Sequence, residues 1–169
     1  AGIQAPLPAL TLPYREFTDE DVRQRHLYVE ASRGCPFKCE FCLSALDKTA
    51  WPFELEPFLA ELEILYQRGA RTFKFVDRTF NLNLRVSQSI LEFFLERYRP
   101  GMFLHFELIP DHLPEKLKEA IARFPEGTLQ FEIGIQTFNP EVQGRISRKQ
   151  DDAQAENNIR WLRGQSDED

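Results

Sequence analysis

Residues 26–42 have the sequence HLYVEASRGCPFKCEFC, in which a β-prone apolar segment runs directly into a loop that holds every cysteine of the chain. The cysteines are Cys35, Cys39 and Cys42, and three thiols cannot pair as disulfides without leaving one over. A structural zinc site needs a fourth donor, and the three histidines of the chain lie far from this loop in the sequence. Three thiolates on one tight loop can instead bind three irons of a [4Fe–4S] cluster and leave the fourth iron open to a small molecule.

The order of strand, loop and helix repeats after this loop. The hydrophobic pattern predicts strands over residues 26–32, 72–76, 102–108 and 129–135, and helices over residues 51–69, 84–97, 114–124 and 151–163, with a short helix after Asn139-Pro140. Strands that alternate with helices are joined in parallel by right-handed crossovers. We therefore predict an α/β fold, a partial (β/α) barrel of parallel strands that is truncated after about four β/α units.

Length and composition predict one core. The chain has 169 residues, of which 42% are hydrophobic, and it shows no internal repeat. Residues 1–25 contain Pro6, Pro8 and Pro13, which predict a proline-rich linker, and Thr18-x-x-Asp21 predicts a capping box for one short helix within it. Residues 26–169 are then the incomplete core domain.

Charge and hydropathy exclude some partners. The net charge of −6 and the pI near 5.2 argue against a protein that binds nucleic acid by bulk electrostatics. No apolar run is long enough to cross a membrane, and the first residues lack a signal pattern. Free thiolates that await iron fit a reducing compartment, so we expect the cytoplasm.

Polar side chains stand where the predicted strands end. Asp77 follows the second strand, Glu107 lies at the end of the third and Gln136 follows the fourth. Parallel α/β folds bind ligands at the carboxyl ends of their strands. Each residue taken alone is equally a solvated loop residue, but their coincidence with the cysteine loop predicts one site. Alternation along the fourth strand places Glu132 opposite Ile133 and Ile135, as an outward-facing residue.

Two motifs carry a resemblance to a known family. Cys35-x3-Cys39-x2-Cys42, with Phe41 before the last cysteine, resembles the signature of the radical S-adenosylmethionine (SAM) enzymes. The run FEIGIQTFNPEVQ at residues 131–143, continuing to Arg148-Lys149-Gln150, resembles oxygen-independent coproporphyrinogen III dehydrogenase of that superfamily. The run FVDRTFN at residues 75–81, together with SRGCPF at residues 32–37 and the proline-rich lead-in, is similar to the branch that carries a cobalamin-binding domain upstream.

The resemblance implies cofactors and roles. Cys35, Cys39 and Cys42 would hold a [4Fe–4S] cluster whose open iron is chelated by the amino acid part of SAM. Gln136 would bond a ribose hydroxyl, while Arg148 and Glu107 would form a charged pair that positions the methionine end of SAM. Many relatives carry Gly-Gly-Glu after the second strand to receive the ammonium group, and here Asp77 would do so. An electron donor such as flavodoxin or ferredoxin would reduce the cluster, and SAM cleavage would start radical chemistry on a substrate that the sequence does not identify. Cobalamin would come with a domain outside these residues.

The chain also departs from the family. Ser44 stands where the coproporphyrinogen dehydrogenases carry a further cysteine, and relatives usually build six β/α units where this chain has four. We therefore expect an excised fragment whose fourth strand exposes an unpaired edge and favours a dimer. The alternative functions are a non-catalytic metal-binding module and a scaffold fragment whose site needs the missing strands.

Overall fold

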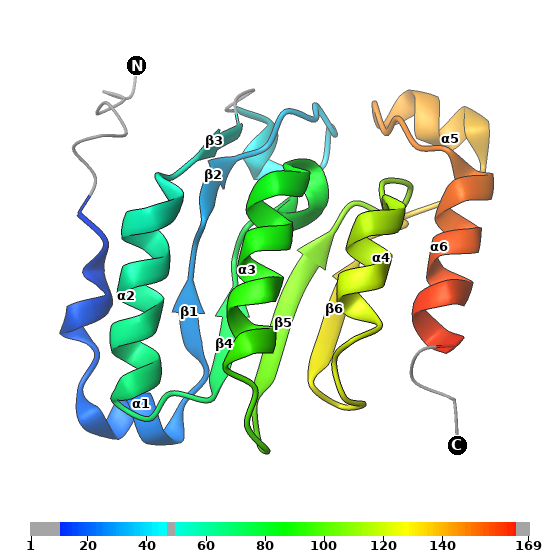
Figure 1. Cartoon of the computed structure of the whole chain (residues 1–169). Helices are drawn as coiled ribbons and strands as arrows, with labels where there is room; N and C mark the ends of the chain where they lie inside the picture. Colours follow the sequence, from blue (N-terminus) through cyan, green and yellow to red (C-terminus); the bar gives the residue numbers. More distant parts are fainter. Residues whose placement is uncertain (1–10, 47–49, 165–169) are drawn as a thin grey trace.

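The structure, a computed structural model, describes residues 11–46 and 50–164 and contains two sheets (Figure 1). The larger sheet has the strand order β1-β4-β5-β6, and the smaller one pairs β2 with β3. The strands of the larger sheet are β1 (Leu27–Val29), β4 (Thr72–Phe75), β5 (Phe103–Leu108) and β6 (Leu129–Ile133). All three pairings in this sheet are parallel. The predicted α/β fold of parallel strands is confirmed.

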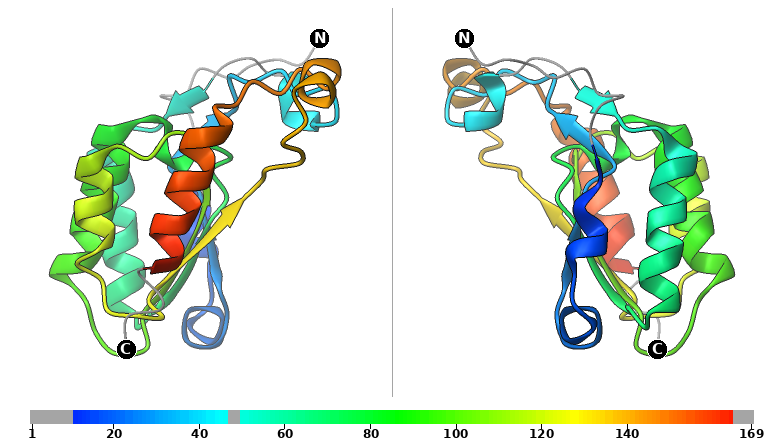
Figure 2. Two further views of the ribbon diagram at one scale, coloured as in Figure 1. Left: turned by 90° about the vertical axis from the view of Figure 1, so that its right-hand side faces the viewer. Right: turned by 90° about the vertical axis from the view of Figure 1, so that its left-hand side faces the viewer.

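Three of the helices connect successive strands of the larger sheet and cover one of its faces. The α-helices are α1 (Asp19–Gln24), α2 (Leu55–Gln67), α3 (Leu84–Glu96), α4 (Glu115–Ile121), α5 (Pro140–Arg145) and α6 (Asp152–Gly164). Short 3-10 helices are η2 (Pro13–Glu16), η3 (Leu43–Leu46) and η4 (Phe80–Leu82). None of the helices in the described ranges has the length and apolar character that a membrane span requires. Side views show α2, α3 and α4 against one face, while the cysteine loop and α5 overhang the other face at the carboxyl ends of the strands (Figure 2).

Alternation along the strands separates an apolar face from a polar one. Phe73 and Phe75 of β4 and Phe106 of β5 are fully buried beneath the helices. The Phe106 ring centroid lies 4.7 Å from that of Phe75 and 4.1 Å from that of Phe80, so aromatic contacts join neighbouring strands to the loop that follows β4. The intervening residues Lys74, His105 and Glu107 belong to the opposite face, which the cysteine loop overhangs and which we call the inner face.

Polar side chains fix the starts of three helices. Thr18 and Asp21 form the predicted capping box at the start of α1. Asn83 accepts a hydrogen bond from Val86 N at the start of α3. Asn139 accepts from the backbone of Glu141 and Val142 at the start of α5, where Pro140 supplies a compatible φ angle. The short helix predicted after Asn139-Pro140 is therefore confirmed as α5, with Asn139 as its cap.

Residues 50–52 differ from the prediction. Trp51 and Pro52 were expected to open a helix, but they lie in β3 (Ala50–Pro52), which pairs with β2 (Ser32–Gly34) in antiparallel register. Phe53 N donates to Ala31 O at 2.9 Å, so the backbone of this segment is bound to the segment after β1. The helix begins only at Leu55, and the long first strand predicted over residues 26–32 is split into β1 and β2.

The expected linker is packed onto the core from residue 12 onward. Tyr14 is buried, and its hydroxyl donates to Glu30 O at 3.0 Å and accepts from Glu30 N at 2.8 Å. Val22 of α1 is also buried. Pro6 and Pro8 lie outside the described residues. The lead-in therefore satisfies the backbone of Glu30 just before the cysteine loop, a role that a free linker would not have.

Removing the Phe106 ring should destabilise the fold strongly. Phe106→Ala deletes a fully buried ring from the aromatic cluster, and such substitutions cost about 3–5 kcal/mol. Phe138, which is 52% exposed, provides a matched control, and we expect Phe138→Ala to change the free energy of unfolding by less than about 0.5 kcal/mol. Denaturant titrations monitored by circular dichroism measure both values. Equal effects of the two substitutions would contradict this packing.

Candidate functional site

The cysteine loop is held by its own turns and by a distant segment. Gly34 has a φ of +94°, which lets the chain turn from β2 into the loop, and Cys42 N donates to Cys39 O at 3.0 Å. Residues 146–148, which follow α5, contact the loop: Glu40 N donates to Ile146 O at 3.0 Å, and Ser147 Oγ donates to Glu40 Oε1 at 2.9 Å. The loop is thus fixed at both its start and its middle.

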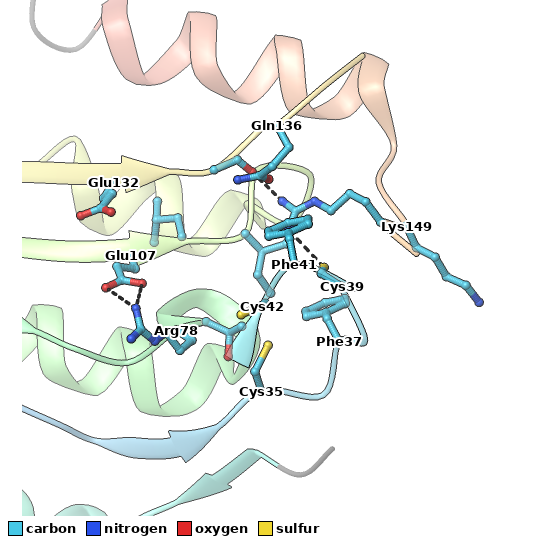
Figure 3. Close-up of a pocket in the computed structure, with 15 residues that line it drawn as sticks. Cys35, Phe37, Cys39, Phe41, Cys42, Arg78, Glu107, Glu132, Gln136 and Lys149 are labelled. Atoms are coloured by element: carbon cyan, nitrogen blue, oxygen red, sulfur yellow. Dashed lines mark hydrogen bonds and ion pairs between the residues drawn. The ribbon is translucent and has the colours of Figure 1, made fainter. Parts of the chain in front are cut away.

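All three cysteines are free thiols that line one pocket. Cys35 and Cys39 are buried and Cys42 is half-buried. The cavity, of about 220 Å³, lies at the carboxyl ends of the strands. Its wall also includes Phe37, Phe41, Arg78, Thr79, Glu107, Leu108, Ile109, Glu132, Gly134, Gln136, Arg148 and Lys149. Figure 3 shows the three sulfur atoms on one side of the pocket and the carboxylates of Glu107 and Glu132 farther along the sheet. Burial raises the pKa of the Cys35 thiol, and a hydrogen bond from Phe37 N opposes this shift.

Gln136 sits where the backbone leaves β6. It has a φ of +62°, in the left-handed region that few residues other than glycine adopt. Its amide folds over Gly134, where an added Cβ would lie 3.0 Å from Nε2 of Gln136. Glycine at position 134 therefore allows the Gln136 side chain to lie against the backbone at the pocket wall.

Arg148 joins the cysteine loop to β6. Its Nη1 donates to Cys39 Sγ at 3.8 Å, and its Nη2 donates to Gly134 O at 2.6 Å. Its Nε is buried without a hydrogen-bond partner. The guanidinium is therefore held between two walls of the pocket, and its Nε–H has no partner among the described residues.

Glu107 has a different partner from the one expected. The resemblance implied a pair between Glu107 and Arg148, but Glu107 binds Arg78, whose Nη1 lies 3.3 Å from Oε2. Arg78 follows the buried Asp77 at the end of β4, which brings its guanidinium in front of the neighbouring strand β5. The expected pair is thus corrected to Arg78–Glu107.

Asp77 lies apart from the pocket that holds the cysteines. Its carboxylate accepts hydrogen bonds from Ala31 N at 3.0 Å and 3.1 Å and from Ser32 Oγ at 2.6 Å. Asp77 lines a neighbouring cavity beneath β2 and β3. Because its acceptor atoms are committed to the backbone and hydroxyl just before the loop, the structure does not place it to receive an ammonium group. It anchors the segment between β1 and β2.

The inner face of the sheet adds charged groups that the sequence reasoning missed or placed elsewhere. Glu132 was expected to face outward, but its partner across the strands is Glu107 and it lines the same pocket. His105 Nε2 lies 3.5 Å from Glu132 Oε2, and Lys74 Nζ lies 4.0 Å from it. Burial, with a smaller contribution from the Lys74 charge, lowers the pKa of His105. Arg78 and Lys149 also line the pocket. Both stand in motifs that carry the family resemblance, FVDRTFN and Arg148-Lys149-Gln150, but the resemblance implied no role for either.

The donor set fits the cluster that the resemblance implies. Three free thiols on one loop line the pocket, and each thiolate can bind a different iron of a [4Fe–4S] cluster. Arg148, whose Nε has no hydrogen-bond partner among the described residues, lines the same pocket.

Comparison with known sequences identifies a family and a relative. The sequence model of the family described as "Radical SAM superfamily" matches residues 29–166. An uncharacterized methyltransferase of Pyrococcus horikoshii is 45% identical over 58 residues, which represent 32% of this chain and 13% of that protein.

Solved structures share the fold. TsrM from Kitasatospora setae, a radical S-adenosylmethionine methyltransferase, matches in two states. The structure with cobalamin and a [4Fe–4S] cluster gives a TM-score of 0.68 over 84% of this chain, and the one with tryptophan and a SAM analogue gives 0.69 over 86%. Each match has 18% sequence identity and covers 29% of the TsrM chain. The chain therefore spans less than a third of the length of these proteins, and the likeness shows a common fold.

The pH dependence of stability should report on Asp77. Burial raises its pKa from 3.8 to about 6. A carboxyl group with a higher pKa in the folded chain stabilises the fold when protonated, so this contribution is present below about pH 4 and is lost as the pH rises through about 6. Between about pH 4 and pH 7, the wild type should lose on the order of 3 kcal/mol of unfolding free energy relative to Asp77→Asn. Denaturant titrations at several pH values measure this difference, and parallel curves for the two proteins would refute the assignment.

Proposed function

We infer the function from the family match, which shows that the chain belongs to the radical SAM superfamily. Membership implies a [4Fe–4S] cluster and SAM as cofactors. We propose that this chain is the core of an enzyme that holds the cluster on Cys35, Cys39 and Cys42 and cleaves SAM reductively to start radical chemistry on a substrate.

The observation that carries this proposal is the composition of a single pocket. Three thiols from the loop after β2 share its wall with Glu107 of β5, Gln136 after β6 and Arg148 after α5. These residues are separated by up to 113 positions in the sequence. Convergence of thiols with polar groups at the carboxyl ends of parallel strands is the arrangement that a cluster and a charged cofactor require.

Each residue has a proposed task. The cysteine thiolates would bind three irons, and the Nε of Arg148 would donate to a group bound beside them. Gln136 would hydrogen-bond a ribose hydroxyl. Arg78 holds the Glu107 carboxylate in place at the pocket wall, so Glu107 would orient a cationic or hydroxyl group of the cofactor. Phe37 and Phe41 line the pocket and would limit access of water to the cluster.

The hard chemistry belongs to the cofactors. When bound and reduced, the cluster would supply one electron that breaks a carbon–sulfur bond of the SAM sulfonium, giving methionine and a 5′-deoxyadenosyl radical. The residues of this chain bind, orient and shield the reacting groups. Reductive cleavage of SAM also requires an electron donor, and we expect a low-potential protein such as flavodoxin or ferredoxin to supply the electron. We expect the protein to work in the reducing cytoplasm.

Methyl transfer is the outcome that we propose for the whole protein. The support is the methyltransferase relative that is 45% identical over 58 residues. The fold shared with TsrM, which was solved with cobalamin, adds a reason to test that cofactor. The competing functions are a metal-binding module without catalysis and a scaffold fragment, and both predict no cleavage of SAM.

Loss of one ligand should abolish cluster assembly. After anaerobic reconstitution with iron and sulfide, the wild type should be brown, with broad visible absorption, and should form 5′-deoxyadenosine when it is reduced with SAM. Cys39→Ala should retain little iron and form no product, because a cluster with two protein ligands is labile. Ser44→Ala, a change two residues beyond Cys42, is the control and should behave like the wild type. Iron analysis and chromatography of the products give the result. Unchanged iron in Cys39→Ala, or zinc in the wild type, would contradict the proposal.

Gln136 should contribute to SAM affinity. Gln136→Leu removes a hydrogen-bonding amide from the pocket wall and should weaken binding of SAM to the reconstituted protein by about tenfold, the worth of one good hydrogen bond. Gln130→Leu, an exposed change on the same strand, is the control and should leave binding within about twofold. Isothermal titration calorimetry under nitrogen measures both. Equal SAM affinities of the two variants would show that Gln136 does not bind SAM.

A further inference from the structure

We propose that Arg148 is a positioning residue that donates a charged hydrogen bond to the Cys39 sulfur and thereby raises the reduction potential of the cluster. The inference rests on the proposed function, because it requires a cluster on the cysteines. It assigns Arg148 a role toward the sulfur itself, in addition to its predicted contact with SAM.

The guanidinium bridges two parts of the pocket. Nη1 lies 3.8 Å from Cys39 Sγ, within hydrogen-bonding reach for a sulfur acceptor, and Nη2 lies 2.6 Å from Gly134 O. Gln150 Oε1 accepts a third, longer bond at 3.4 Å. The bond to the Gly134 carbonyl fixes the plane of the guanidinium, so the direction of Nη1 toward the sulfur is set by the residue that follows β6.

The backbone on both sides of this contact is also fixed. Arg148 N donates to Gln143 O at 2.9 Å, which ties residue 148 to α5. The loop that carries Cys39 is bound to the same segment through Glu40 N and Ile146 O. Ser147 has a φ of +53°, an uncommon conformation for serine, and its hydroxyl bonds the Glu40 side chain. The positions of the Cys39 sulfur and the Arg148 guanidinium are therefore fixed by these surrounding hydrogen bonds as well as by the bond between the two groups.

The unused donor of Arg148 points to a ligand. Nε is buried and has no partner, and a buried N–H without an acceptor costs free energy. An inorganic sulfide of the cluster or a carboxylate bound beside it would supply that acceptor. The side chain thus has one N–H on a cysteine sulfur and another available to the group that the cysteines hold.

The direction of the effect follows from charge. Reduction adds one negative charge to the cluster, and a hydrogen bond from a cation stabilises the more negative state more than the less negative one. Hydrogen bonds to the sulfurs are among the factors that set the potentials of iron–sulfur clusters. Arg148 should therefore make the cluster easier to reduce. Lys149 also lines the pocket, but it is exposed and its side chain extends away from the sulfurs (Figure 3).

The test is a redox titration of the reconstituted full chain without SAM, followed by electron paramagnetic resonance. Arg148→Met removes the charge and the hydrogen bond, and Arg148→Lys keeps the charge but loses the fork. Arg145→Met is the matched control, because Arg145 lies three residues away and its guanidinium pairs with Glu141. At the potential where the wild type is half reduced, Arg148→Met should show at least a tenfold lower ratio of reduced to oxidised cluster, about 59 mV for one electron. Arg148→Lys should show a smaller fall, and Arg145→Met should stay within about twofold.

The outcomes separate this inference from the proposed function. Wild type without cysteine-bound iron would overturn both. A wild type with a cluster, but with the same potential in Arg148→Met as in Arg145→Met, would overturn the role of Arg148 alone. If Arg148→Met fails to retain iron, Arg148→Lys decides the matter: a lower reduced fraction than in the wild type supports the contact with sulfur, and an equal fraction refutes it.

Discussion

Parallel pairing of β1, β4, β5 and β6 is the constraint on which the site depends. Because all four strands run in the same direction, the segments that follow them emerge at one edge of the sheet. Phenylalanine side chains such as Phe75 and Phe106 bind the strands to one another and to the helices on one face. The alternate side chains, among them Glu107 and Glu132, are left on the other face. One periodicity therefore builds both the core and the polar wall of the pocket.

The sequence predicted the main elements because their hydrophobic periods are regular. The strands of the larger sheet and most helices differ from their predicted bounds by a few residues at each end. The β2–β3 pair escaped prediction, since three-residue strands carry too little periodicity and Pro52 suggests a helix start as well as a strand end. The contacts of the lead-in could not be predicted either, because the hydroxyl of Tyr14 bonds a backbone group at Glu30, 16 positions away.

The pocket could be predicted in part. Strand order alone was enough to group the cysteine loop with Glu107 and Gln136, because these lie at or after strand ends. The partners of the charged groups were not accessible in this way. Asp77 and Arg78 are adjacent, yet the first turns beneath β2 and the second turns to β5. Neighbouring side chains at a strand end point in opposite directions. Which of them reaches the pocket depends on the conformation of the loop, and a loop has no hydrophobic periodicity from which that conformation could be predicted.

The contacts between residues 35–42 and residues 146–148 join segments that are more than a hundred positions apart. Closing so long a loop is slow and entropically costly, so such contacts form late in folding. During synthesis the cysteines leave the ribosome long before Arg148 does. The cysteine loop therefore lacks its contacts with residues 146–148, including the bond from Arg148 to Cys39, until those residues have been synthesised.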